Sequence, residues 1–259
     1  MATRFVATRT RFALDALATE HERTTAERDA FAEFRERITA MDASQVSLDN
    51  GHYQQLGGQA IIHSQPNKQL QRVREAYRET IMSVSHYDEE YHDSLQESLA
   101  KEFGSEIASA LTTDKQFTPP LRDQLLRESQ QAHAERATFL KTLSRETEDL
   151  RSVDELITEI GSDLDTLNIR SLETWAIVDL TESHNQLLAT EERCEELLTM
   201  RQTTLQNPRI PGPTPNDLDL NEYLYQSLSI TYPVLADLAD FVDTLRTERS
   251  RIERTLYSH

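Results

Sequence analysis

The chain has 259 residues, with 45 acidic side chains against 27 basic ones and a formal net charge of −18. Its 6 Gly and 8 Pro are too few for a sandwich, a barrel or a doubly wound sheet, which need many turns. Disorder along the whole chain is disfavoured because apolar residues recur at a fixed helical spacing. The single cysteine, Cys194, excludes an intramolecular disulfide framework.

The basic residues are unusual in kind, because only 4 are Lys and the other 23 are Arg. An acidic surface poor in Lys is typical of proteins in concentrated salt, where a Debye length of about 3 Å at 1 M screens repulsion between carboxylates. A GC-rich genome that favours Arg over Lys is the alternative explanation. In both cases we expect no general affinity for nucleic acid, and we expect high salt to support stability.

The apolar runs of the sequence are only a few residues long, too short to cross a bilayer. The N-terminus is basic but lacks the apolar stretch of a secretory signal. We therefore expect a cytoplasmic protein without membrane insertion.

Taken in chain order, the apolar spacing predicts a long helix within residues 1–42. Apolar residues near its end step by three and four: Phe31, Phe34, Ile38 and Met41. Half of the glycines lie in residues 43–66, which are predicted to be a linker. Region 67–117 is predicted to be a shorter, acidic helical part, with Gly104 between two of its helices.

Residues 118–207 carry the clearest pattern. Pro119 is favoured at the first position of a helix, and apolar residues then alternate steps of three and four, which is typical of a coiled coil. Only Glu146 interrupts this stripe. A second stripe follows Ser171, includes Cys194 and ends before the first proline of the next segment. Because a short turn joins two helices of comparable length, the sequence predicts an antiparallel hairpin.

The remaining chain consists of a Pro-rich connector at 208–220 and a segment at 221–259 with aromatic residues and a C-terminal helix. The predicted fold class is therefore all-α: a long antiparallel coiled-coil-like helical hairpin, with a shorter helical part and a C-terminal helix packed along it. The apolar stripes of the helices are expected to be buried either against one another in an internal bundle or at the interface of a homodimer.

One pair of residues has a metal-binding spacing. Glu89 and His92 form the Glu-x-x-His pattern of di-iron carboxylate bundles. Such a centre needs a second pair and two further glutamates, and no other Glu precedes a His by three residues. Zinc motifs and Gly-rich phosphate loops are also absent from the sequence. We therefore assign no metal ligand, no cofactor and no catalytic residue, and we expect Cys194 to be a small buried thiol.

Two further groups of residues are candidates for binding. The basic turn of Arg72, Arg74 and Arg78 is interpreted as an ion-pair surface rather than a nucleic-acid helix, because a run of carboxylates follows it. The aromatic residues after the Pro-rich connector are interpreted as packing residues, and they become a candidate docking surface if they are exposed. These candidate docking residues are Tyr223, Leu224, Tyr225 and Tyr232.

Several phrases of the sequence carry a resemblance to a known family. They lie at residues 26–31, 73–80, 86–91, 192–195 and 223–235. Through these phrases the chain resembles domain of unknown function 7260, an uncharacterised haloarchaeal family, along nearly its whole length and in the same order. The resemblance implies a haloarchaeal cytoplasmic setting and transfers no activity.

The predicted function is a non-enzymatic helical protein–protein interaction or scaffolding role, with an unknown protein partner or a second copy of the chain. A transcriptional or other regulator that uses region 67–117 is an alternative, and an exposed basic helix after a tight turn would favour it. A metal-dependent enzyme is the less favoured alternative, which metal content after purification would support.

Overall fold

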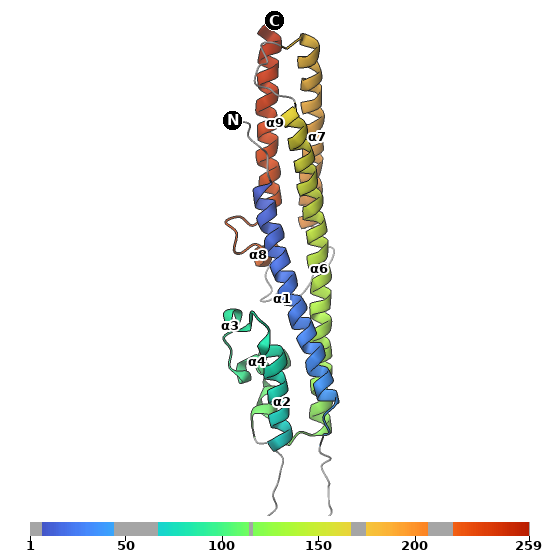
Figure 1. The fold of residues 1–259 in the computed structure, drawn as a ribbon, viewed down its shortest axis with the longest axis vertical. Helices are drawn as coiled ribbons and strands as arrows, with labels where there is room; N and C mark the ends of the chain where they lie inside the picture. Colours follow the sequence, from blue (N-terminus) through green and yellow to red (C-terminus); the bar gives the residue numbers. More distant parts are fainter. Residues whose placement is uncertain (1–6, 44–66, 114–115, 167–174, 207–219, 259) are drawn as a thin grey trace, which may run out of the picture. The chain divides into compact units, whose positions relative to one another are not determined.

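A computed structural model of the chain describes residues 7–43, 67–113, 116–166, 175–206 and 220–258 (Figure 1). Within these residues the regular structure is helical and contains no strand, so the predicted all-α class is confirmed. The helices in chain order are α1 (Thr8–Thr39), α2 (Asn67–Thr80), the 3₁₀ turn η1 (Ile81–Ser83), α3 (Tyr87–Glu90), α4 (Leu95–Phe103), α5 (Ser105–Thr112), α6 (Pro119–Thr166), α7 (Ile177–Gln206), α8 (Leu220–Leu224) and α9 (Pro233–Ser258).

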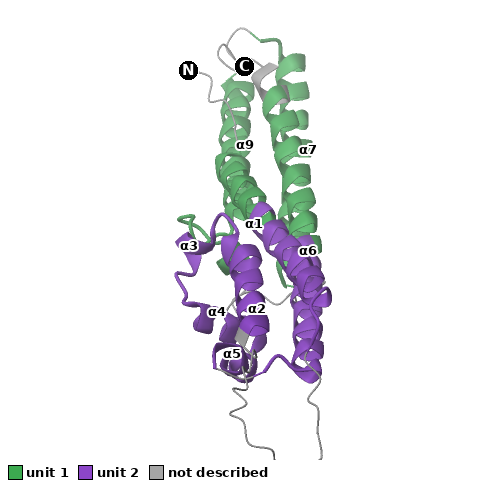
Figure 2. Cartoon of the chain, turned by 60° about the horizontal axis from the view of Figure 1, so that its bottom comes forward, with its two compact units in different colours: residues 1–21, 141–259 green, residues 22–140 purple. Residues whose placement is uncertain are grey.

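The chain divides into two compact units (Figure 2). Unit 1 comprises residues 1–21 and 141–259, and unit 2 comprises residues 22–140. These boundaries differ from the predicted succession of segments, because α1 and α6 are long enough to contribute residues to both units. The predicted linker and the Pro-rich connector lie almost wholly outside the described residues.

Unit 1 is a bundle in which α7 and α9 pack against each other and against the second half of α6. The shared core consists of Ile160, Leu180, Leu187, Cys194, Phe241, Val242, Leu245 and Ile252. His184 of α7 pairs with Glu253 of α9, whereas Glu191, further along α7, pairs with Arg246. Residue numbers therefore rise along α7 as they fall along α9, and the two helices are antiparallel.

The predicted antiparallel hairpin is the pair of α6 and α7. Glu146 of α6 contacts Arg201 of α7, and Ile160 shares the core with Leu187. The prediction that α7 begins near Ser171 is wrong in detail, because Trp175 and Ala176 are not helical. The first turn starts where the amide of Leu180 donates to the carbonyl of Ala176, so α7 is shorter than α6.

Unit 2 is built around a cluster of aromatic rings. Phe34 of α1 lies edge-on to Tyr77 of α2, with ring centroids 5.5 Å apart, and stacks with Phe103 of α4 at 5.9 Å. Gly104 ends α4 with a φ of 84°, a conformation that costs glycine little, so it separates α4 from α5 as predicted. Ser94 begins α4 with a capping box to Glu97.

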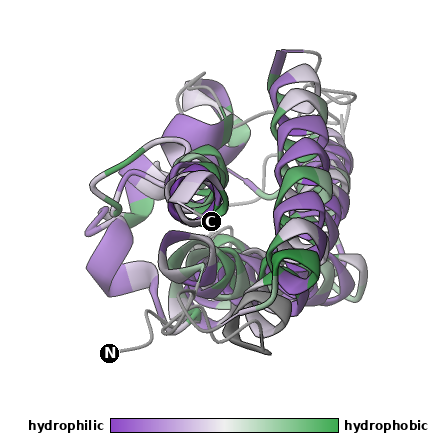
Figure 3. Ribbon diagram, turned by 90° about the horizontal axis from the view of Figure 1, so that it is seen from above, coloured by the Kyte–Doolittle hydropathy of each residue, from purple (hydrophilic) through white to green (hydrophobic). Residues whose placement is uncertain are grey.

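The long helices carry hydrophilic and hydrophobic residues along their whole length (Figure 3). This mixture follows from the steps of three and four, which place apolar residues on one stripe of each helix. None of the helices in the described ranges combines the length and apolar character required to cross a membrane.

Candidate functional site

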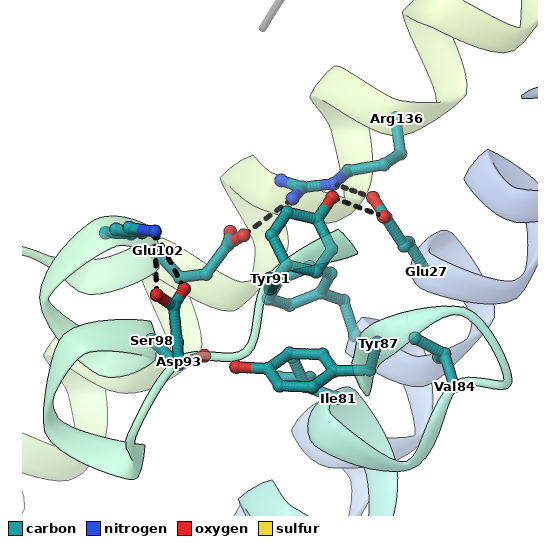
Figure 4. A pocket seen from close by; sticks show the side chains of 11 residues that line it. Glu27, Ile81, Val84, Tyr87, Tyr91, Asp93, Ser98, Glu102 and Arg136 are labelled. Carbon is teal, nitrogen blue, oxygen red and sulfur yellow. Dashed lines mark hydrogen bonds and ion pairs between the residues drawn. The ribbon is translucent and has the colours of Figure 1, made fainter. Parts of the chain in front are cut away.

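A network of partly buried charges lies in unit 2, around Arg136 of α6 (Figure 4). Its Nε donates to Glu27 Oε2 of α1 at 3.2 Å, and its Nη2 donates to Glu102 Oε1 of α4 at 2.7 Å. The guanidinium carbon also lies 4.7 Å from the centroid of the Phe31 ring, in cation–π geometry. One arginine therefore connects three helices.

The carboxylate of Glu27 is the second centre of this network. Its Oε1 accepts a hydrogen bond from the Tyr91 hydroxyl at 2.9 Å and lies 3.1 Å from His86 Nε2. His86 Nε2 is also 4.0 Å from Glu90 Oε2, and Glu90 forms an ion pair with Arg23. The network thus joins α1 to the short segment around α3.

Burial and charge shift the proton affinities of these groups. Burial raises the pKa of Glu102, and the nearby Arg136 only partly reverses this change. Burial lowers the pKa of Arg136, but Glu102 and Glu27 outweigh that effect, so its pKa is raised. Burial and the neighbouring Glu27 raise the pKa of Tyr91. At neutral pH, Arg136 therefore stays charged and Tyr91 stays a hydrogen-bond donor.

Glu27, His86 and Glu90 are the group within the described residues whose ligand atoms are close enough to share a metal ion, all within 4.8 Å. Both carboxylates already pair with arginines, Glu27 with Arg136 and Glu90 with Arg23. A divalent cation there would be repelled by two guanidinium groups. The arrangement therefore fits an internal ion-pair network better than a metal centre.

The Glu-x-x-His pair singled out in the sequence does not form a common ligand face. α3 ends at Glu90, and His92 lies beyond it with a φ of 47°. Glu89 and His92 are both exposed. The neighbouring His86 takes the inward position instead, but its partner Glu27 is 59 residues away, so no local spacing could have identified the pair.

A cavity of about 40 Å³ adjoins this network (Figure 4). Its walls are Glu27, Phe31, Ile81, Val84, Tyr87, Tyr91, Asp93, Ser98, Lys101, Glu102 and Arg136. Lys101 Nζ donates to both oxygens of Asp93 at 2.8 Å. The hydroxyl of Tyr87 is buried and has no hydrogen-bond partner among the described residues, while Ser98 Oγ is bonded to the Tyr77 hydroxyl at 2.8 Å. The cavity therefore combines aromatic walls, charged groups and one unused hydroxyl.

The helix proposed for a regulator is α2. Its Val73, Ala76 and Tyr77 are buried in unit 2, so only its other face meets solvent. On that face the exposed Arg72 and Arg78 alternate with exposed Glu75 and Glu79. The exposed surface is thus mixed in sign, unlike the basic surface expected of a recognition helix.

The predicted docking residues are placed differently from one another. Leu224 and Tyr225 are buried in the chain's own core, so they are packing residues and do not meet the exposure required of a docking surface. In its buried position the Tyr225 hydroxyl donates a hydrogen bond to Glu146 Oε1 at 2.7 Å. Tyr223 is partly buried and donates to Glu20 at 2.8 Å, whereas Tyr232 is exposed.

The strongest buried ion pair of unit 1 was not anticipated. The Glu146 carboxylate accepts hydrogen bonds from both terminal nitrogens of Arg201, and the distance from Nη1 to Oε2 is 3.0 Å. Both side chains are buried. Each interrupts the apolar stripe of its helix. Two such interruptions at matching depths of an antiparallel hairpin are the signal that could have predicted the pair. Cys194 is confirmed as a buried thiol, and burial raises its pKa to about 11.

The outward face of α7 carries aliphatic side chains at its beginning. Ile177 is 57% exposed and Val178 is 74% exposed, and Leu188 is also exposed. A shallow groove of about 590 Å³ follows this face. The groove is lined by Ile177, Val178, Thr181, Glu182, Asn185, Gln186 and Ala189.

Comparison with known proteins identifies a family for the chain but no significantly similar curated protein or solved structure. The family described as Domain of unknown function (DUF7260) matches residues 8–249, and its range includes α1, the charge network of unit 2, the α6–α7 hairpin and most of α9. The chain therefore belongs to this family.

Proposed function

We propose that this protein is a non-enzymatic helical interaction protein that binds an amphipathic helix of another protein on the outward face of α7. The observation that supports this proposal is the exposure of Ile177 and Val178. Burying a Val or Ile side chain that is otherwise exposed contributes about 1.5–3 kcal/mol. Burial of this face under a partner therefore makes the free energy of binding more favourable.

The described residues that line the groove all belong to α7, so it is an open surface along one helix, on which a partner helix can pack. Its lining residues Val178, Thr181, Asn185 and Ala189 are separated by three or four positions, so they follow one line along α7. A helix with apolar residues at the same spacing can lie along this line. The side chains are small or aliphatic, which allows close approach of the partner.

The charge around the groove favours a partner other than a second copy of the chain. Its lining includes the exposed carboxylate of Glu182, the exposed Asp179 lies three positions earlier on α7, and none of the described lining residues is basic. In a two-fold contact each copy would place the same carboxylates against those of its partner. A helix with Arg or Lys beside its apolar stripe complements these carboxylates instead.

A photo-cross-linking experiment tests this surface. Benzoylphenylalanine replaces Val178 in the full chain in native cells, and the matched control carries it at Glu159, which is exposed on α6. We expect position 178 to cross-link one main protein through a basic amphipathic segment, and we expect Ile177→Asp to abolish the product. The purified partner should then bind the chain in vitro.

Two results would contradict the proposal. Equal products at positions 178 and 159 would mean that the α7 face has no preference for a partner. A cross-linked species of twice the chain's mass would mean that a second copy occupies the groove.

We also propose that the protein works in a concentrated-salt cytoplasm, in line with its net charge of −18 and its 4 Lys. Helicity measured by circular dichroism is expected to fall as KCl is lowered from molar to millimolar concentrations, because repulsion between carboxylates is no longer screened. An uncharged osmolyte at equal osmolality should not restore the signal fully. Constant helicity over the whole KCl series would show that the acidity has another origin.

A further inference from the structure

We propose that the cavity of unit 2 is a binding site for a small primary ammonium compound. Its nitrogen would lie against the Tyr87 hydroxyl and the Asp93 carboxylate, and its short carbon body would lie among the aromatic rings. This site is separate from the α7 groove in every residue.

The first argument is the hydroxyl of Tyr87. The residue is only 5% exposed, and its oxygen is buried without a hydrogen-bond partner within the described structure. Buried hydroxyls without partners are rare because losing water is costly. Ser98 lines the same cavity, and its Oγ is bonded to the Tyr77 hydroxyl at 2.8 Å. A bound N–H donor would satisfy the Tyr87 oxygen.

The second argument is the charge of the wall. Three carboxylates, Glu27, Asp93 and Glu102, face two cations, Lys101 and Arg136, so one negative charge is in excess. The Asp93 side chain is 12% exposed, whereas its partner Lys101 is 63% exposed. Lys101 is therefore the more solvent-exposed member of this pair, and Asp93 is the less exposed one. A ligand cation that takes the place of Lys101 would neutralise the Asp93 carboxylate.

The third argument is the nature and size of the cavity. Tyr87 and Tyr91 form a tilted ring pair with centroids 5.4 Å apart, and Phe31 adds a third ring. Aromatic faces attract organic cations and accept their carbon atoms. A volume of about 40 Å³ admits a body of only a few heavy atoms, since one water needs about 10–15 Å³. An anion fits poorly, because the three carboxylates of the wall outnumber its two cations.

Titration calorimetry of the full chain in molar KCl tests the site, with n-butylammonium chloride as the probe. We expect saturable binding of n-butylammonium and at least about tenfold weaker binding of n-butanol, which has the same shape without the charge. Tetramethylammonium is expected to bind more weakly than n-butylammonium because it has no N–H to donate.

The matched variants are Tyr87→Phe and Tyr257→Phe, each of which loses one hydroxyl. Tyr87→Phe should keep the fold, because it removes a hydroxyl without a partner, and should weaken n-butylammonium binding about tenfold. Tyr257 is exposed at the end of α9, so its variant should bind like the original chain. A second variant, Asp93→Asn, should also weaken binding.

The proposal is overturned if n-butylammonium does not bind, because the cavity then holds only water. It is also overturned if Tyr87→Phe and Asp93→Asn bind as well as the original chain, since the cation then lies elsewhere. Equal affinity for n-butanol would show an apolar cavity without selectivity for a cation.

Discussion

Replacing Arg201 by Met is expected to lower the free energy of unfolding of unit 1 by about 3–5 kcal/mol, because Glu146 then stays buried without its cation. Among the described residues, the Tyr225 hydroxyl would still donate to that carboxylate. Urea unfolding at constant molar KCl measures the loss, because urea leaves the ionic strength unchanged. Fluorescence of Trp175 is the signal, since this single tryptophan packs against the core of unit 1.

The matched control is Arg251→Met. Arg251 pairs with Glu248 on the surface of α9, where an ion pair contributes about 0–1 kcal/mol. A triple variant with Glu146→Leu, Arg201→Met and Tyr225→Phe should recover most of the lost stability, because apolar groups tolerate burial where an unpaired charge does not. Equal losses for Arg201→Met and Arg251→Met would show that the buried pair contributes no more than a surface pair.

The helices that the sequence predicts most accurately are those with a long, mostly apolar stripe. Pro119 begins α6 as expected, and the stripe of α9 includes Leu238, Val242, Leu245 and Ile252, all of which are buried. Such patterns depend only on local spacing and on the need to bury apolar surface. They are therefore visible in the sequence before any tertiary contact is known.

The parts that the sequence did not reveal depend on contacts between distant residues. Arg136 and Glu27 are 109 positions apart, and no periodicity relates them. The Glu-x-x-His spacing in segment 86–92 does not identify the residue that joins the network, which is His86, because α3 ends too early to align Glu89 with His92. The packing of whole helices decides which charged residues form an ion pair. The spacing of residues along one helix does not contain this information.

The same distinction explains the docking residues. Tyr225 lies in an aromatic segment after a Pro-rich connector, which is a reasonable pattern for an exposed ligand. Its burial follows from a hydrogen bond to Glu146, 79 residues away, and from the need of that carboxylate for donors. The exposed face at Ile177 and Val178 went unnoticed, because the sequence placed the beginning of α7 too early and so assigned these residues to the interior of a helix.

Ile157→Asp is expected to lower the free energy of unfolding of unit 1 by about 3 kcal/mol or more, because it places a charge without a partner inside the bundle. Ile157 lies on the buried side of α6 and is 2% exposed. Trp175 fluorescence in urea at molar KCl measures this loss, and circular dichroism reports the accompanying loss of helix.

Two variants separate this effect from a general sensitivity of α6. Glu159→Gln, two residues further on the exposed side, should cost less than about 0.5 kcal/mol. Ile157→Val keeps the site apolar and should cost about 0.5–1.5 kcal/mol for the lost methyl group. The three losses should therefore increase in the order Glu159→Gln, Ile157→Val, Ile157→Asp. If Ile157→Asp and Glu159→Gln shift the unfolding curve equally, position 157 does not face the core, and the register of the hairpin must be different.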